Sequence, residues 1–519
     1  MRLTQSAHLD PFCRENLPAA PLWPELDFTL PELTYPDSVN CAAALLDETI
    51  ERFGADRPCV TGAGDSWTYG ELAARARTVA AVLVNEYGLV PGNRVLLRSP
   101  NNPWLVAWWL GVLLAGGVVV TTMPLLRAGE LRTIAEISQP SLAICDTRFL
   151  DDLIAADIPG LPIVPSDQLA AAPPADFSHV RTAADDVAML AFTSGTTGRP
   201  KATMHFHRDV LAIADTYGRH VLRAEPTDVF VGTPPLAFTF GLGALVVFPM
   251  RAGASTVLLE KPSPDTLAAA IEDHSATVVF TAPLAYRALL SVGKLASLRR
   301  CVSAGEHLPE SVWREFRDRT GIAILDGIGA TEMLHIFISR VDGDDKPGST
   351  GRPVPGYQAM VVDESGSAVP DGTAGLLAVR GPTGCRYLAD ERQRKYVRDG
   401  WNLTGDVYVR DSDGYFWYQA RSDDMIVSAG YNIAGPEVEE ALLRHPDVAE
   451  CAVVGVPDDS RGMIVKAVVV PAAGVTPSAE VLQDFVKKEI APYKYPRLVE
   501  FRDELPRTAT GKLQRFRLR

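Results

Sequence analysis

The sequence is poor in cysteine, and its few cysteines are not spaced like disulfide partners or metal ligands. The chain has 519 residues and 7 cysteines, scattered from Cys13 to Cys451 without a C-x-x-C pair. An odd, dispersed set excludes a disulfide-rich scaffold and fits no thiolate metal site. The N-terminus also lacks a basic stretch followed by an apolar core, which is the pattern of a signal peptide. We therefore expect a cytoplasmic protein.

Positive charge is also in short supply. Fifty lysine and arginine residues stand against 64 aspartates and glutamates, which gives a net charge of −14. This balance disfavours nonspecific binding to nucleic acid or to an anionic membrane. Neither is expected as a partner, and the sequence leaves the oligomeric state open.

Long apolar runs are rare, and the one from Trp104 to Met123 needs an explanation. It carries no charge and is long enough to cross a bilayer. However, Gly116-Gly117 divides it into a helix-like half and a β-branched half, and Pro103 and Pro124 bracket it. This pattern predicts a buried helix followed by a buried strand.

Apolar segments of strand length alternate with helical patterns over most of the chain. Thr68 and Glu71 form a capping-box pattern that starts a helix near Tyr69. The expected strands include 94–98, 118–122, 142–145, 187–192, 229–231, 255–259, 277–280 and 300–303. Such alternation favours an α/β fold of mainly parallel sheets covered by helices.

The pattern changes twice toward the C-terminus. After about Gly351, short alternating strands with Gly/Asp turns predict a β-rich subdomain over about 351–420. From Met425 onward, helices and strands predict a small α+β domain over 425–519. The charged junction 421–424 fits a hinge, or simply an exposed turn. The expected domains are therefore 1–420 and 425–519.

A loop rich in glycine and hydroxyl groups, Thr193–Lys201, follows the apolar strand 187–192. Glycines let backbone N–H groups converge, hydroxyls add donors and Lys201 adds a positive charge, so the loop suits a polyphosphate. It is not a Walker loop, because Gly198 is followed by Arg199-Pro200 rather than by Lys-Ser/Thr. A surface turn rich in these residues is the alternative.

Three further stretches carry weaker signals. Asp326–Glu332 is expected as a strand that ends in a Gly-x-Gly loop, with Glu332 free to hold a cation. Trp401–Asp406 is expected as a strand-edge loop, whose Asp406 binds a ribose diol or forms an Asx-turn. Arg507–Lys512 places a lysine on a glycine turn, or is a solvated tail. His205 and His207 have no visible third ligand, so no metal site is expected there.

Taken in order, these motifs match one family. SGTTGRPK, TPPLAF, DGIGATE, LTGD, RSDD and TGK resemble the motifs of the adenylate-forming superfamily of acyl-CoA synthetases, adenylation domains and luciferases. The resemblance spans the chain from about residue 40 to its end. A finer similarity is to aryl-CoA ligases of the benzoate and 2-aminobenzoate (anthranilate) type. Three stretches carry it: the N-terminal stretch that runs from Ser6–Asp10 to Glu25-Leu26, the segment Lys201–His207, and the segment Glu332–Phe337.

The resemblance implies two half-reactions that use ATP, Mg²⁺ and CoA. A carboxylate attacks the α-phosphate of Mg-ATP to give acyl-AMP and pyrophosphate, and the CoA thiol then displaces AMP. The assigned phosphate ligands are Thr193, Ser194, Gly195, Thr196, Thr197 and Lys201 for the β- and γ-phosphates and Thr331 for the α-phosphate. Glu332 is assigned to magnesium, and Asp406 and Arg421 are assigned to the ribose. The residues assigned to adenine are Gly305, Glu306, His307, Asp326, Gly327 and Ile328. Lys512 is assigned as the catalytic cation that bridges carboxylate and phosphate.

The resemblance also implies that the C-terminal domain rotates about a hinge at Asp423 after adenylation. The rotation withdraws Lys512 and brings Ser428, Gly430 and Tyr431 to the pantetheine of CoA. The expected acyl pocket is apolar and aromatic, as a flat aryl acid requires. Its expected lining is Phe238, Ala304, Gly329 and His335, although His335 could instead be a packed residue on a helix after Glu332.

The leading expectation is an ATP-dependent aryl-CoA ligase, with 2-aminobenzoate as the first choice of acid and benzoate as the second. The closest alternative is a stand-alone enzyme that loads an aryl acid onto an acyl carrier protein in trans. A luciferase-like oxidation is more distant. A nucleotide-binding regulator without catalysis is disfavoured by the joint presence of Lys512, Glu332 and Asp406.

Overall fold

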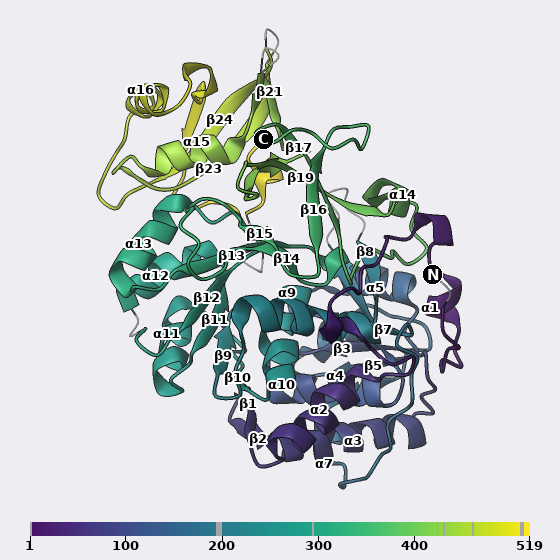
Figure 1. Ribbon diagram of the computed structural model, residues 1–519. Helices are drawn as coiled ribbons and strands as arrows, with labels where there is room; N and C mark the ends of the chain where they lie inside the picture. The colour runs from purple at the N-terminus through teal and green to yellow at the C-terminus, as the bar shows by residue number, and fades with distance from the viewer. Residues whose placement is uncertain are drawn as a thin grey trace.

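The computed structural model describes residues 3–193, 200–292, 295–422, 424–428, 431–458, 461–508 and 513–519. Figure 1 shows a large N-terminal body, a green β-rich part above it, and a small yellow-green C-terminal body at the upper left, beside the β-rich part. The expected α/β class is confirmed. Five groups of predicted site residues, namely Ser194 to Thr197, Asp423, Gly430, the side chain of Tyr431 and Lys512, lie outside the described residues.

One sheet of the large body has the strand order β6-β5-β3-β4-β7-β8. Its strands are parallel except for β7 and β8, which pair antiparallel and set Thr193 opposite Lys201. Strand β8 was not predicted. The strands are β3 (Arg94–Arg98), β4 (Val118–Thr122), β5 (Leu142–Cys145), β6 (Ile163–Pro165), β7 (Val187–Thr193) and β8 (Lys201–Phe206).

The second sheet has the order β15-β14-β13-β12-β11-β9-β10-β1-β2 and is parallel from β13 to β1. Its strands are β1 (Pro58–Gly62), β2 (Asp65–Thr68), β9 (Val229–Gly232), β10 (Ser255–Val257), β11 (Val278–Thr281), β12 (Arg300–Ser303), β13 (Ile324–Gly329), β14 (Ile336–Ser339) and β15 (Arg352–Pro353).

Strand β13 corrects one prediction. Asp326, Gly327, Ile328 and Gly329 are not a loop, because β13 continues through them and pairs antiparallel with β14. The glycines permit close packing of this pair. A Cβ on Gly327 would lie 2.8 Å from Ile336 Cγ2, and one on Gly329 would lie 2.8 Å from the carbonyl oxygen of His335.

Helices cover these sheets (Figure 1). The longer ones are α2 (Cys41–Phe53), α3 (Tyr69–Asn85), α4 (Pro103–Leu114), α5 (Ala128–Ser138), α11 (Pro264–Asp273), α12 (Pro283–Val292), α13 (Glu310–Thr320), α15 (Gly435–Leu443) and α16 (Ala479–Glu489). The short ones are α1 (Phe12–Glu15), α6 (Leu150–Ala155), α7 (Ser166–Ala171), α8 (His207–Ile213), α9 (Thr239–Leu242), α10 (Phe248–Ala252) and α14 (Gln393–Tyr396). The 3₁₀ helices are η1 (Ala20–Leu22), η2 (Pro31–Leu33), η3 (Thr147–Phe149), η6 (Thr331–Met333), η7 (Pro492–Lys494) and η8 (Arg515–Arg517). Two segments, η4 (Ala214–Leu222) and η5 (Gly243–Val247), are π-helical.

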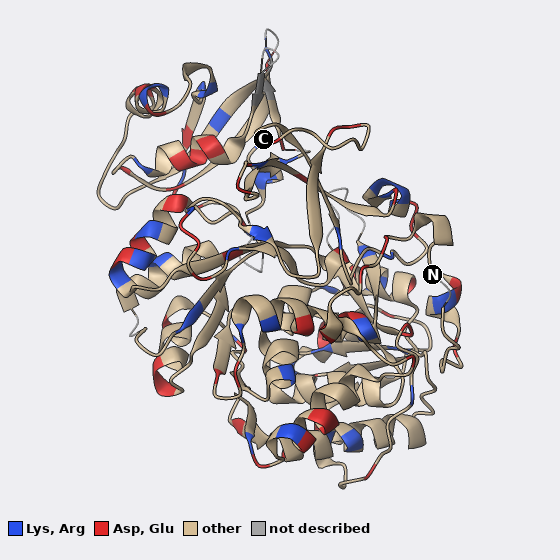
Figure 2. Ribbon diagram, viewed as in Figure 1, with Lys and Arg blue, Asp and Glu red and all other residues tan. Residues whose placement is uncertain are grey.

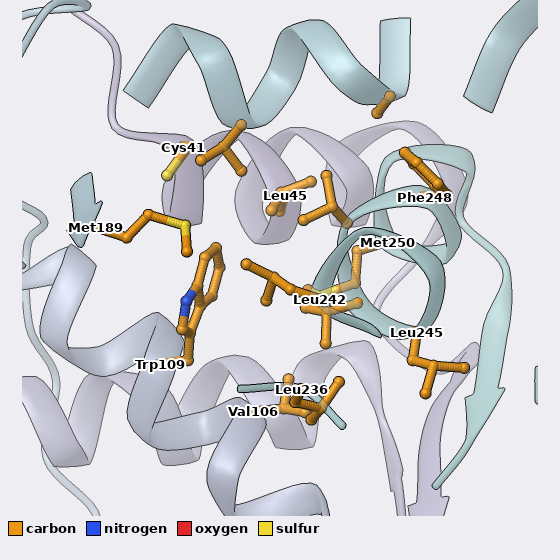
Figure 3. Close-up of a cluster of buried hydrophobic side chains, with 14 of the residues drawn as sticks. Cys41, Leu45, Val106, Trp109, Met189, Leu236, Leu242, Leu245, Phe248 and Met250 are labelled. Carbon is orange, nitrogen blue, oxygen red and sulfur yellow. The ribbon is translucent and has the colours of Figure 1, made fainter. Parts of the chain in front are cut away.

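Helix α4 and strand β4 are the buried helix and strand predicted for the uncharged run. In Figure 3, Trp109 of α4 points toward Cys41 and Leu45 of α2, beside Leu242 and Met250. All of these side chains belong to one buried cluster. Across the described residues, no helix combines the length and the apolar character needed to span a bilayer.

The cysteines lie inside the protein as free thiols. Cys451 is half-buried, and the other six are buried. Burial raises the pKa of Cys13 and of Cys145 to about 12. These thiols therefore stay protonated at neutral pH, which makes them poor nucleophiles.

The β-rich part is antiparallel and has the order β16-β17-β19-β18, with β20 on β19. Strand β19 corrects a second prediction, because it runs unbroken through the expected loop at Trp401–Asp406, and Gly405 has a φ of +79° within it. The strands are β16 (Gln358–Val362), β17 (Ala374–Arg380), β18 (Val397–Arg398), β19 (Trp401–Arg410) and β20 (Phe416–Arg421).

The C-terminal body has its own sheet and core. The sheet order is β22-β21-β24-β23, with β25 on β24, and α15 and α16 pack on it. Ile426, Val438, Leu442 and Val465 lie in its core. The strands are β21 (Ile426–Ser428), β22 (Tyr431–Ile433), β23 (Val448–Asp458), β24 (Gly462–Pro471) and β25 (Leu498–Phe501).

A buried ion pair fastens the segment after β17 to the large body. Arg386 and Asp209 of α8 are in direct contact, and both side chains are fully buried. The Arg386 guanidinium also lies 4.0 Å from the ring centroid of Phe206. Removing one partner of such a pair leaves an uncompensated buried charge.

We therefore expect Arg386→Met to lower the free energy of unfolding by about 3–5 kcal/mol. Urea unfolding followed by tryptophan fluorescence measures this loss. Arg410→Met is the matched control, since Arg410 pairs with Asp371 at the surface and should cost less than about 1 kcal/mol. The double variant Arg386→Met/Asp209→Asn should be more stable than Arg386→Met alone. Equal losses in the Arg386 and Arg410 variants would contradict the assignment.

Candidate active site

A charged cluster joins three distant parts of the chain. Lys201 opens β8, Glu332 lies on η6 and Tyr387 follows β17. Lys201 Nζ donates to the Tyr387 hydroxyl oxygen at 2.7 Å and lies 3.5 Å from Glu332 Oε1, while the Tyr387 hydroxyl donates to the Glu332 carboxylate. Sequence reasoning singled out Lys201 and Glu332 but not Tyr387, because no motif marks a lone tyrosine whose partners lie more than 50 residues away in the chain.

Thr331, beside Glu332, is held through its backbone by His205 of β8. His205 Nε2 lies 2.8 Å from the Thr331 carbonyl oxygen, which can only accept, so we assign the ring proton to Nε2. Burial lowers the pKa of His205 to about 4, so the imidazole is neutral at physiological pH. The imidazole of His205 is thus a buried group that holds the backbone of Thr331.

The cluster suits a magnesium ion that arrives with phosphate. Among the described residues, no group of three histidine, cysteine, aspartate or glutamate side chains could hold a metal ion. Magnesium is commonly bound by one or two carboxylates together with phosphate oxygens. Glu332, which is 7% exposed, could supply the carboxylate if its contact with Lys201 were exchanged for the ion.

The residues predicted to frame adenine meet where β12 ends beside the middle of β13. Ser303 of β12 pairs with Asp326 of β13, so Gly305 to His307 emerge beside Asp326. Gly305 has a φ of +90°, a conformation that favours glycine. Burial raises the pKa of Asp326 to about 8. The His307 ring stacks on Tyr418 of β20, with centroids 5.6 Å apart, and Tyr418 was not predicted from the sequence.

The two residues predicted to bind ribose contact each other. Asp406 and Arg421 are cross-strand partners in β19 and β20. Arg421 donates to Asp406 Oδ1 at 3.1 Å and to the Thr404 carbonyl at 3.2 Å. The carboxylate is therefore oriented by a fixed strand pair, although the predicted loop is absent.

His335 lies in an aromatic box and not on a helix, which corrects the predicted helix after Glu332. Leu334 has a φ of +69° and ends η6, and β14 begins directly after His335. His335 is 2% exposed, and burial lowers the pKa of its imidazole to about 3. The surrounding rings are Tyr217, Phe240, Phe248 and Phe280, at centroid distances of 5.4, 5.6, 4.6 and 6.4 Å.

Two π-helical segments border this box. Tyr217 lies on η4 and Gly243 on η5. A Cβ on Gly243 would lie 2.4 Å from His335 Cδ2, so the missing side chain makes room for the imidazole. π-Helical turns within helices are frequent at functional sites. Of the other predicted pocket residues, Gly329 packs against the His335 backbone, Ala304 is buried and Phe238 is 36% exposed.

The C-terminal body reaches the predicted adenine residues. The Leu513 N–H donates to Glu306 Oε1 at 3.2 Å, and Arg507 lies 3.6 Å from the same oxygen. Ser428, predicted to contact CoA, is buried on β21 and pairs with Tyr431 of β22. Leu513, which follows position 512 in the chain, is therefore adjacent to the candidate nucleotide site.

Comparisons with known proteins find relatives along nearly the whole chain. The AMP-binding enzyme family matches residues 46–387, and the AMP-binding enzyme C-terminal domain matches residues 437–512. A benzoate–CoA ligase of Thauera aromatica is 34% identical over 95% of this chain and 98% of its own length. Among solved structures, the anthranilate CoA ligase AuaEII in complex with anthranoyl-AMP is 33% identical with a TM-score of 0.89, over 94% of this chain and 98% of that one.

A second solved structure gives the same result. The benzoate CoA ligase from Burkholderia xenovorans LB400 is 36% identical with a TM-score of 0.86, and the match covers 93% of this chain and 100% of that chain. Such identities over nearly full lengths show common descent as well as a common fold. The chain therefore belongs to the AMP-binding, adenylate-forming enzyme family.

Proposed function

We propose that the protein is an ATP-dependent aryl-CoA ligase. The aromatic carboxylate attacks the α-phosphate of ATP, forming an acyl–O–P bond and releasing pyrophosphate. The CoA thiol then attacks the acyl carbon, forming a thioester and releasing AMP. The observation that carries this proposal is the Lys201–Tyr387–Glu332 cluster beside Thr331, in a chain that matches a benzoate–CoA ligase along nearly its whole length.

The first half-reaction brings two anions together, so cations and hydrogen-bond donors must offset the charge. In the proposed assignment, Lys201 and the hydroxyl groups of 193–197 hold the departing phosphates, and Thr331 contacts the α-phosphate. Glu332 holds magnesium, which neutralises phosphate charge when bound. Lys512 bridges the reacting carboxylate and phosphate.

The nucleoside end of ATP is assigned to rigid parts of the fold. Adenine lies against Gly305–His307 and Asp326–Ile328, and Asp406 with Arg421 binds the ribose. The strand pairing of β12 with β13 and of β19 with β20 supports these assignments, because it fixes the positions of the adenine residues and of the ribose residues before the nucleotide binds.

CoA is the proposed acceptor of the acyl group. The relatives are named as CoA ligases, and no observation favours the carrier-protein alternative. In this proposal the chain divides into a domain of residues 1–420, a hinge over 421–424 with Asp423, and a domain of residues 425–519. Rotation of the second domain about the hinge withdraws Lys512 from the site and brings Ser428, Gly430 and Tyr431 to CoA. The two half-reactions then use one site in turn.

The proposed acid is 2-aminobenzoate first and benzoate second. The proposed pocket lining, Phe238, Ala304, Gly329 and His335, is apolar and aromatic, which suits a flat ring. His335 Nε2 lies 3.4 Å from the Phe240 carbonyl, while Nδ1 is buried and has no hydrogen-bond partner among the described residues. A neutral imidazole nitrogen of this kind can accept a hydrogen bond from a ring amino group, which supports the amino-substituted acid.

The direct test measures both half-reactions of the purified protein. With ATP and Mg²⁺, 2-aminobenzoate or benzoate should release pyrophosphate, and added CoA should give the thioester and AMP, detected by chromatography. Salicylate and a medium-chain fatty acid are the comparison acids, and a holo-carrier protein is the comparison acceptor. No pyrophosphate release with any aromatic acid would refute the proposal, and transfer only to the carrier would replace the acceptor.

Lys512→Ala should separate the half-reactions. Adenylation is expected to fall by about 10²–10³-fold, because the variant loses a charge aimed at the transition state. Thioester formation from supplied aryl-AMP and CoA should stay near the wild-type rate. Single-turnover assays of each half-reaction check this, with Lys488→Ala on α16 as a control lysine in the same body. An equal fall in both half-reactions would show that Lys512 has another role.

Glu332→Gln should raise the magnesium requirement. The amide lacks the carboxylate charge, so the Mg²⁺ concentration for half-maximal adenylation is expected to rise about tenfold. Tyr387→Phe is the matched variant, because it removes the hydroxyl that contacts Glu332 and retains the carboxylate. It should lower the adenylation rate with little change in the magnesium requirement. The assignment fails if both variants show the wild-type magnesium dependence.

A further inference from the structure

Helix α13 begins without a cap from its own segment. Its N-cap position is Pro309, whose side chain makes no capping hydrogen bond. The first helical N–H groups, those of Glu310 and Ser311, instead donate to the carboxylate of Glu440 at 3.2 and 3.4 Å. Glu440 lies on α15 of the C-terminal body, so the cap of α13 comes from the other part of the molecule.

The charges at this contact are complementary. The N-terminus of a helix carries unpaired N–H donors and a partial positive charge, and a carboxylate placed there is stabilising. Figure 2 shows acidic residues on α15 above the start of α13, and the two helices are in contact. Because proline cannot cap a helix with its side chain, Glu440 supplies what the local sequence lacks.

The other glutamates of α15 have partners inside the C-terminal body. Glu437 accepts from Lys494 Nζ at 2.5 Å. Glu439 accepts from the Val453 N–H at 2.6 Å and from Arg515. Glu440 therefore differs from its neighbours on the same helix in reaching across to the large body.

Two further contacts accompany the Glu440 cap. Arg287 of α12 donates to the Ala449 carbonyl at 3.0 Å. The Leu513 N–H donates to Glu306 beside the proposed adenine site at 3.2 Å. The arrangement that Glu440 holds is thus the one in which the C-terminal segment lies against the nucleotide residues.

We propose that Glu440 is a positioning residue for adenylation: its carboxylate caps α13 and holds the C-terminal body in the arrangement that activates the acid. This inference rests on the proposed function, because it assigns the contact to one half-reaction. Glu440 touches neither the nucleotide residues nor the acyl box, so it acts only by stabilising one orientation. The second half-reaction, which needs the body to move, does not depend on it.

The test compares Glu440→Ala with Glu437→Ala on the same helix. Glu440→Ala should lower the single-turnover rate of pyrophosphate release by about three- to tenfold, which lies within what a carboxylate at a helix N-terminus contributes. Thioester formation from supplied aryl-AMP should stay at the wild-type rate, and Glu437→Ala should leave adenylation near wild type. A wild-type adenylation rate in Glu440→Ala, or an equal loss in both half-reactions, overturns the proposal.

A local role in helix stability is distinguished by a second variant. Pro309→Ser restores a side-chain cap to α13 from its own segment. In the Glu440→Ala background it should recover any lost thermal stability but leave adenylation low, because the connection between the bodies is still missing. Full recovery of adenylation by Pro309→Ser would reduce Glu440 to a cap of α13 and refute its positioning role.

The controls keep this inference separate from the proposed function. If wild-type protein releases no pyrophosphate with any aryl acid, the proposed function fails before the variants are compared. If wild-type protein is active and Glu440→Ala matches it, only the positioning role fails. Small-angle scattering gives a readout besides activity: with ATP present, Glu440→Ala should have a larger radius of gyration than Glu437→Ala.

Discussion

The contact of Lys201, Tyr387 and Glu332 depends on three layers of the fold being in place at once. Lys201 comes from the sheet of the first half, Glu332 lies between β13 and β14 of the second sheet, and Tyr387 lies between β17 and β18 of the β-rich part. Next to Tyr387, the buried pair Arg386–Asp209 fixes that segment. The charged centre is therefore a junction of separate elements, and its geometry depends on their packing more than on any one loop.

Local chemistry made part of this arrangement predictable. The predicted strand 118–122 is β4, and Thr68 and Glu71 form the expected capping box at the start of α3. The motifs also located Asp406 and Arg421, which pair across two strands. These features were accessible because apolar periodicity, capping and charged residues beside glycines act over a few residues.

The misplaced features depend on long-range packing. Glycines at 327 and 405 suggested loops, yet β13 and β19 run through them because their antiparallel neighbours supply the backbone hydrogen bonds. Strand β8 begins with a lysine and contains a histidine, so its sequence is not typical of a buried strand. Tyr387 and Tyr418 gain their roles from residues far away in the chain, and a single sequence without such contacts cannot reveal them.

The burial of the cysteines has a consequence for an enzyme that makes acyl-adenylates. A mixed anhydride of a carboxylic acid and AMP reacts with any accessible thiolate, including one on the protein that made it. Here the thiols are buried or half-buried, and burial raises the pKa of Cys13 and of Cys145 to about 12. Burial and the raised pKa therefore disfavour acylation of these two thiols by an acyl-adenylate.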